Sequence, residues 1–309
     1  MRSRALAVLS WCAALIVPTA IGAMLWHLCL RGGPALGLDL FFGDAPPLAA
    51  LLGQRPVWDG IWPAAAGTLS LLALTMALAL LPGVGCGVYL ACFAAPRAKR
   101  WLSLAVDLLA GVPSIVMGLF GFMLILLLRR LFAPEATTCL LLSAFCLALL
   151  VLPPLAITTR TVLESLPDGL RLTGEALGLT PWQTARYLLL PAGGRGILGG
   201  VMLALGRAAE DTAVIMVTGA VANAGLPAGL TAKYEALPFF IFYISAQYAD
   251  QSDLRRGFGA ALVLLILSGA LLLCALVGIF VLTQAFGKRL SQFTADLCQT
   301  LDHMIAGNE

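Results

Sequence analysis

The chain has 309 residues, of which 60% are hydrophobic and only 11% are charged, and its mean hydropathy is +0.95. This balance excludes an ordinary soluble domain and is typical of a polytopic membrane protein. The formal net charge of +3, without a Lys/Arg-rich run, excludes a nucleic-acid-binding protein.

Six apolar segments are long enough to cross a membrane, which takes about 20 residues of helix. They lie at residues 5–30, 64–93, 101–128, 138–157, 196–222 and 257–286. The first is longer than the roughly 7 to 15 apolar residues of a signal peptide, so we expect it to remain as a helix. The sequence therefore predicts an all-α, polytopic integral membrane protein with six transmembrane helices.

The basic residues predict the orientation of these helices. The link at residues 96–100, between the second and third spans, carries Arg97, Lys99 and Arg100. Because cytoplasmic loops are enriched in Lys and Arg, this link marks the cytoplasmic side. The basic residues as a whole favour both termini in the cytoplasm, although Arg129 and Arg130 fall on the outer side.

Glycine and proline interrupt two of the predicted spans. Residues 81–87 read Leu-Pro-Gly-Val-Gly-Cys-Gly, which predicts a kink or a close helix contact. Residues 111–114 read Gly-Val-Pro-Ser and leave two interpretations open. The helix breaks there and presents free N–H groups to an anion, or the glycine only packs closely beside a proline kink.

The motifs of common enzymes are missing from the sequence. The Gly287-Lys288 pair is followed by Arg289, so there is no phosphate-binding loop of the GxxxxGK[ST] kind. There is also no HExxH motif, nucleophile elbow or cluster of histidines. We therefore expect a chain that is not an enzyme, with no catalytic residues, no metal site and no cofactor of its own.

A long connector at residues 158–195 follows the fourth span, on the predicted cytoplasmic side. Its centre predicts a helix, a Gly-Leu-Thr turn, and a second helix over residues 181–190 that begins with a proline. Two short helices joined by a turn form either a docking element or a solvated connector. The length of the connector favours docking.

The connector resembles the cytoplasmic loop of the permease subunits of ABC importers. That loop carries the pattern Glu-Ala-Ala, three residues, Gly, nine residues, Ile, one residue, Leu-Pro. Gly178, Leu188, Leu190 and Pro191 stand at this spacing, whereas Leu172-Thr173-Gly174 replaces Glu-Ala-Ala. The resemblance implies that this loop contacts an ATP-binding subunit through Glu175, Ala176, Gly178, Trp182, Leu190 and Pro191.

Two further stretches, at residues 111–122 and 203–220, resemble the signature segments of phosphate importer permeases of the PstA and PstC type. The resemblance covers roughly residues 68–284 and implies the type I ABC importer permease fold. The compact N-terminus of the chain and the short outer segment between its first two spans look more like PstA than PstC. The implied division is an N-terminal helix and periplasmic segment (1–63), the transporter domain (64–286) with its coupling loop (158–195), and a cytoplasmic amphipathic tail (287–309).

The same resemblance implies the location and the partners. The protein is expected in the bacterial inner membrane, with a second, PstC-like permease subunit, two ATP-binding subunits and a periplasmic phosphate-binding protein. ATP and Mg²⁺ would be bound by the ATP-binding subunits. The expected function is import of inorganic phosphate; the alternatives are another oxyanion, molybdate or sulfate, or a secondary transporter that works alone.

Three charged residues lie within the fifth predicted span. Arg207 precedes Glu210 by three residues and Asp211 by four, so the three share one helix face, and Arg207 is the twelfth residue from Gly196, near mid-bilayer. Charges inside a membrane usually mark a pathway. They form either an internal salt bridge or, together with Thr212 and Ser114, the substrate pathway. In the pathway interpretation Arg207 contacts phosphate and the acids neutralise Arg207 between passages. In a secondary transporter Glu210 and Asp211 would instead carry protons.

Overall fold

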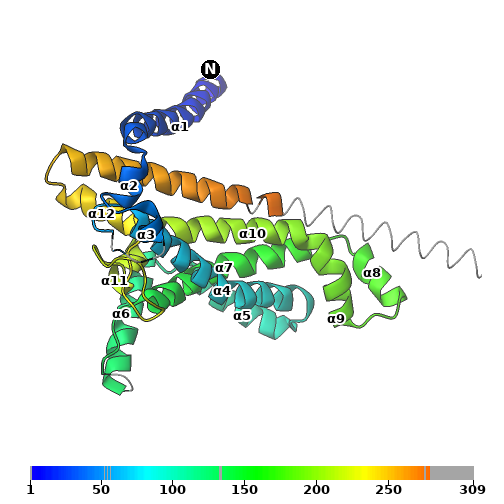
Figure 1. The fold of residues 1–309 in the computed structure, drawn as a ribbon. Coiled ribbons are helices and arrows are strands. Elements are labelled where there is room, and N and C mark those ends of the chain that lie inside the picture. Colours follow the sequence, from blue (N-terminus) through cyan, green and yellow to red (C-terminus); the bar gives the residue numbers. More distant parts are fainter. Residues whose placement is uncertain are drawn as a thin grey trace, which may run out of the picture. The chain divides into compact units, whose positions relative to one another are not determined.

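A computed structural model describes residues 2–278, apart from 52, 54, 56, 132, 133 and 275, with the backbone alone for residues 2–9. The predicted tail at 287–309 and the end of the sixth predicted span lie outside these residues. The regular elements that the structure describes are helices (Figure 1). One isolated parallel bridge, between Ala220 and Tyr234, is the β pairing found in this part of the chain.

The helices follow one another along the chain in the order that Figure 1 labels. They are α1 (Arg2–Gly32), η1 (Gly33–Ala35), α2 (Leu38–Phe42), α3 (Pro47–Leu51), α4 (Trp62–Cys92), α5 (Pro96–Ala110), α6 (Ser114–Leu131), α7 (Leu140–Glu164), α8 (Gly169–Ala176), α9 (Pro181–Thr184), η2 (Ala185–Leu189), α10 (Leu190–Glu210), α11 (Ala213–Thr218) and α12 (Leu237–Gln247). A further helical segment, Gln251–Gly278, follows α12. Asp250 caps it by accepting the amides of Ser252 and Asp253.

Six helical segments of the described residues are long and apolar enough to cross a membrane. They are Ser10–Ala35, Trp62–Cys92, Ser114–Leu131, Leu140–Glu164, Pro181–Glu210 and Gln251–Gly278. The prediction of six spans is therefore confirmed, although their ends differ from those expected, most of all in the third and fifth spans.

The chain forms two compact units. One comprises Met1–Leu74, Ser114–Cys146 and Ala209–Leu267, and the other Thr75–Pro113, Leu147–Ala208 and Ser268–Glu309. The first unit contains α6, α11 and α12, and the second contains α5, α8 and α9. Helices α4, α7 and α10 each contribute to both units.

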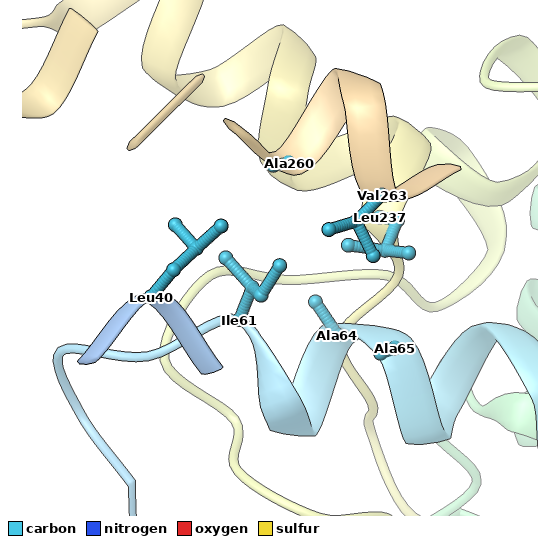
Figure 2. Close-up of a cluster of buried hydrophobic side chains, with 7 residues drawn as sticks. All are labelled: Leu40, Ile61, Ala64, Ala65, Leu237, Ala260 and Val263. Carbon is cyan, nitrogen blue, oxygen red and sulfur yellow. The ribbon is translucent and has the colours of Figure 1, made fainter. Parts of the chain in front are cut away.

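In the first unit, seven buried apolar side chains from α2, the start of α4 and the residue before it, α12 and the last helical segment form a cluster (Figure 2). They are Leu40, Ile61, Ala64, Ala65, Leu237, Ala260 and Val263. Next to this cluster, the buried Thr68 hydroxyl accepts a hydrogen bond from the Leu237 amide at 2.8 Å. The start of α12 is therefore fixed to α4 by apolar packing and by a buried polar contact.

In the second unit, α4, α7 and α10 pack closely through glycines. A Cβ placed on Gly87 would lie 2.5 Å from the Thr159 Cβ, and one on Gly200 would lie 2.7 Å from the Thr158 Cγ2. Val88, Leu163 and Ile197 form the core between these helices. Helix α4 runs through Pro82 without ending, so residues 81–87 make the close helix contact that the sequence predicted.

Candidate functional site

The third predicted span, 101–128, is wrong as a single helix. Helix α5 ends at Ala110, where the Gly111 amide donates to the Asp107 carbonyl at 3.1 Å, and α6 starts anew at Ser114. Pro113 has no amide hydrogen and disfavours helical geometry in Val112, so the helix stops there. Of the two interpretations left open for residues 111–114, the structure shows the helix break, and Ser114, half-buried, is the first residue of the membrane-spanning α6.

In the first unit, α6 packs against the short helix α11. A Cβ on Gly118 would lie 3.1 Å from the Ala213 carbonyl oxygen, and one on Gly121 would lie 2.7 Å from the Thr218 Cγ2. Thr218 in turn donates to the Ser143 hydroxyl of α7 at 2.9 Å. The two stretches that resemble phosphate importer permeases therefore meet at this helix pair.

The fifth predicted span, 196–222, is also wrong as a single helix. Helix α10 ends at Glu210, and α11 begins three residues later at Ala213. The Asp211 Oδ1 atom accepts the Val214 amide at 2.9 Å and so satisfies a free N–H group at the start of α11. Asp and Thr compete for backbone hydrogen bonds and favour helix ends. That preference explains why the helix stops at Asp211 and Thr212.

The charged residues accordingly lie around a helix end. Arg207 is in the last turn of α10, not near the middle of a helix, and a cation there is stabilised by the free carbonyl groups. Arg207 and Glu210 are exposed on this chain, whereas Asp211 and Thr212 are half-buried. Among the residues described here, neither acid forms an ion pair with Arg207. The internal salt bridge between Arg207 and Glu210 or Asp211 is therefore absent from the described residues.

This geometry divides the charged residues by role. The Asp211 carboxylate is committed to the cap of α11, and Glu210 remains as the free acid beside Arg207. The Arg207 guanidinium has no partner acid within 4.0 Å in the described part of the chain, so its five N–H donors are not occupied by an ion pair there. No group of three metal-binding side chains occurs among the described residues.

The connector between α7 and α10 contains the predicted helix, turn and helix. Gly178 has a φ of 69°, the left-handed conformation that ends α8 and that glycine adopts without strain. The Thr180 hydroxyl accepts the Gln183 amide, and the Gln183 side chain accepts the Thr180 amide, a capping box that starts α9. Gly174 of α8 lies against Thr184, which closes the hairpin.

The predicted coupling residues divide into an exposed and a partly covered group. Glu175, Ala176, Gly178 and Trp182 are exposed, whereas Leu190 and Pro191 are half-buried. The Trp182 ring also contacts the Phe93 ring after α4, with centroids 6.2 Å apart. The hairpin of α8 and α9 therefore exposes four of the six predicted residues.

Two bounds of the predicted loop are wrong. Helix α7 continues to Glu164, so the connector begins later than residue 158. The second helix does not stop at residue 190 but continues through the π-helical turn η2 into α10. Pro191 has no backbone N–H group, and the π turn before it accommodates this missing donor. Such turns are frequent at functional sites.

Two acidic residues make contacts that were not predicted from the sequence. Glu164, at the end of α7, binds Lys99 of α5 at 2.6 Å and Arg160 at 3.0 Å. The spacing of Arg160 and Glu164 signals the second pair, but nothing in the sequence signals the first. Glu235 is 6% exposed, and its carboxylate accepts the Gly225 amide at 2.8 Å. Burial raises the pKa of Glu235, and the Gly225 and Ala224 amides partly oppose that rise.

Comparison with known protein families agrees with this architecture. Residues 83–290 match the family model described as "Binding-protein-dependent transport system inner membrane component". The chain belongs to this family. Its six apolar helices and its place in the family make it a multi-pass inner-membrane permease protein.

Curated relatives within the family are permease proteins of phosphate transport systems. The chain is 32% identical to PstA of Haemophilus influenzae over 253 residues, which cover 78% of this chain and 81% of that protein. It is 31% identical to PstA 1 of Mycobacterium tuberculosis, covering 73% and 72%. It is 33% identical to PstC of Mesorhizobium japonicum, but over only 48% of this chain and 52% of that protein. The longer alignments are thus those with PstA.

Solved structures of ABC transporters share the fold. A chain of the MetNI methionine ABC transporter in an inward-facing conformation superposes with a TM-score of 0.55 at 19% identity, covering 77% of this chain and 99% of that one. A chain of a bacterial ABC transporter involved in alginate import gives a TM-score of 0.54 at 12% identity, covering 86% and 94%. The predicted fold of an ABC importer permease is therefore confirmed.

Proposed function

We propose that this chain is the PstA-like permease subunit of an ATP-driven importer that moves inorganic phosphate into the cytoplasm. The observation that carries the proposal is the 32% identity to a phosphate permease, which extends over 78% of this chain. The packing of α6 on α11 supports it, because each stretch that resembles phosphate permeases contributes one helix of that pair. A permease subunit of this kind needs no active site of its own, because ATP hydrolysis belongs to separate subunits of the importer.

The proposed pathway is built around Arg207. Its planar guanidinium matches the oxygen geometry of phosphate, and Glu210 competes for the same group, which keeps binding weak enough for release. Asp211 holds the start of α11, Thr212 offers a hydroxyl group next to it in sequence, and Ser114 offers one at the first residue of α6. This role for Asp211 differs from the neutralising role expected from the sequence.

The test of this pathway is the variant Arg207→Gln. This variant should lower the rate of phosphate uptake at least about tenfold, because a charge-assisted contact to an anion is lost. Arg195→Gln is the matched control, since Arg195 is an exposed basic residue of the same helix. Both variants should assemble in normal amounts, and normal uptake by Arg207→Gln would exclude the proposed contact.

The exposed surface of α8 and α9 is the proposed docking site for the ATP-binding subunits. A second, PstC-like permease subunit and a periplasmic phosphate-binding protein complete the proposed assembly, with both termini of this chain in the cytoplasm. ATP and Mg²⁺ bind to the two ATP-binding subunits, and this chain holds no cofactor. Crosslinks from a cysteine at Gln183 should reach an ATP-binding subunit, and their absence from the assembled complex would refute the assignment.

Substrate competition tests the choice of phosphate. The complex in vesicles, supplied with the binding protein and ATP, should take up labelled phosphate equally well with excess molybdate or sulfate present. Strong competition by either ion would instead assign the permease to that oxyanion.

A further inference from the structure

We propose that four side chains form a clamp that carries movement of the coupling hairpin into α5. The clamp consists of Lys99 and Ser103 of α5 and Arg160 and Glu164 of α7. These are positioning residues that touch neither phosphate nor ATP. The inference rests on the proposed function, because it names how ATP-driven movement at α8 and α9 reaches another part of the second unit.

The clamp links the two helices through two separate polar contacts. The Lys99 Nζ atom lies 2.6 Å from the Glu164 Oε1 atom, and the Arg160 Nη1 atom donates to the Ser103 hydroxyl at 2.8 Å. Within α7, the Arg160 Nε atom donates to the same Glu164 oxygen at 3.0 Å. Glu164 is therefore the shared acceptor, and its removal leaves two cations without their acid.

The location of Glu164 gives the clamp its mechanical significance. Glu164 is the last residue of α7, four residues before the Asp168 cap position of α8. In α8, Arg171 donates to the Ala91 carbonyl of α4 at 3.4 Å. The hairpin is thus held at its base to α5 by Glu164 and to α4 by Arg171.

Helix α5 depends on this link because it has little apolar packing of its own. Val106 is its one buried residue, and Trp101, Leu104 and Leu108 are exposed. A helix with so few buried apolar side chains follows its neighbour through polar contacts, not through a shared core. In contrast, α4, α7 and α10 are joined by buried residues and glycine contacts.

The far end of α5 leads to the candidate pathway. Helix α5 ends at Ala110 and is followed by the break at residues 111–113, before Ser114. A displacement of the α7 end would therefore be delivered, through α5, to the break that precedes the candidate pathway residue. Loss of the clamp should leave the hairpin docked on the ATP-binding subunit but separate its movement from that break.

The test compares Glu164→Ala and Lys99→Ala with Arg97→Ala in the complete transporter. Arg97 is an exposed basic residue of α5 that makes no ion pair in the described part of the chain. Both clamp variants should lower ATP-driven phosphate uptake about 3- to 30-fold, the range of couplings carried by single contacts. Basal ATP hydrolysis should stay within about twofold of wild type. Lys99→Arg keeps the charge and should restore uptake.

A conformational measurement separates coupling from mere stability. Gly111→Cys is tolerated sterically, because a Cβ there lies 3.5 Å from its nearest neighbour, the Leu108 carbonyl oxygen. ATP should change the rate at which a water-soluble maleimide labels Cys at this position, measured on the isolated peptide by mass spectrometry. In the Glu164→Ala background this dependence on ATP should disappear.

Each outcome bears on the clamp or on the function. If the wild-type complex imports phosphate and both clamp variants import it equally fast, the clamp is wrong. An equal loss in Arg97→Ala, or ATP-dependent labelling that survives Glu164→Ala, also overturns it. If the wild-type complex imports no phosphate, the proposed function fails, while the labelling experiment still tests the clamp.

Discussion

The substitution of Gly87 by alanine tests the helix packing most sharply, because the chain supplies a matched control two residues away. Gly85 and Gly87 lie on the same helix, α4. A Cβ on Gly87 would lie 2.5 Å from the Thr159 Cβ and 2.7 Å from the Ala156 carbonyl oxygen, whereas a Cβ on Gly85 would meet nothing within 4 Å. Only the first substitution forces α4 and α7 apart.

The magnitude follows from two opposing effects. Overpacking of a tight interior costs about 1–3 kcal/mol, and replacing a helical glycine by alanine returns about 0.5–1 kcal/mol. Both Gly87 contacts are shorter than 3.0 Å, so the upper part of the overpacking range, about 2–3 kcal/mol, applies, and Gly87→Ala should lower the free energy of unfolding by about 1–2.5 kcal/mol. Gly85→Ala should leave it unchanged or raise it by about 0.5–1 kcal/mol.

The assay is thermal unfolding of the purified protein in one detergent. Gly87→Ala should lower the melting temperature by about 2–8 °C, and Gly85→Ala should not lower it. Equal melting temperatures for the two variants would refute the close approach of α4 and α7.

Three further predictions concern single residues. Asp211→Ala removes the acceptor of the Val214 amide and should cost about 0.5–2 kcal/mol in thermal unfolding, whereas Asp211→Asn keeps it; equal losses would contradict the cap. Because burial raises the pKa of Glu235, its contribution to stability is full below the ordinary glutamate pKa and is lost as the pH rises through the raised value. The melting temperature of the wild type should therefore fall as the pH rises above about 4, and Glu235→Gln should make this fall less steep. An unchanged slope would argue against the raised pKa of Glu235. Gly178→Asp places a side chain at a φ of 69° and a charge on the docking surface. It should lower substrate-linked ATP hydrolysis without changing the amount of protein in the membrane, and unaltered hydrolysis would disprove the docking assignment.

The number of spans was predictable from the sequence because apolar length alone decides it. The ends of the spans were not, because they depend on caps and on contacts with other helices. Pro113 stopped the third span, and the Asp211 cap divided the fifth. Helix α7 reached Glu164, whose carboxylate is bound by Lys99 of a different helix.

The candidate site was predictable in its segments but not in its contacts. The resemblance identified the stretches that pack as α6 and α11, and the turn at Gly178 followed from glycine chemistry. The spacing left open a salt bridge between Arg207 and one of the acids; the described residues contain no such pair, and Asp211 accepts a backbone amide. No local pattern marks Glu235, whose burial arises from segments that are distant in sequence.

The most direct test of the proposed function is uptake of labelled phosphate by vesicles that contain the complete transporter and its binding protein. Vesicles loaded with ATP should accumulate phosphate, and vesicles with a proton gradient but no ATP should not. Uptake driven by the gradient without ATP would contradict the assignment and favour the secondary transporter, in which Glu210 and Asp211 carry protons.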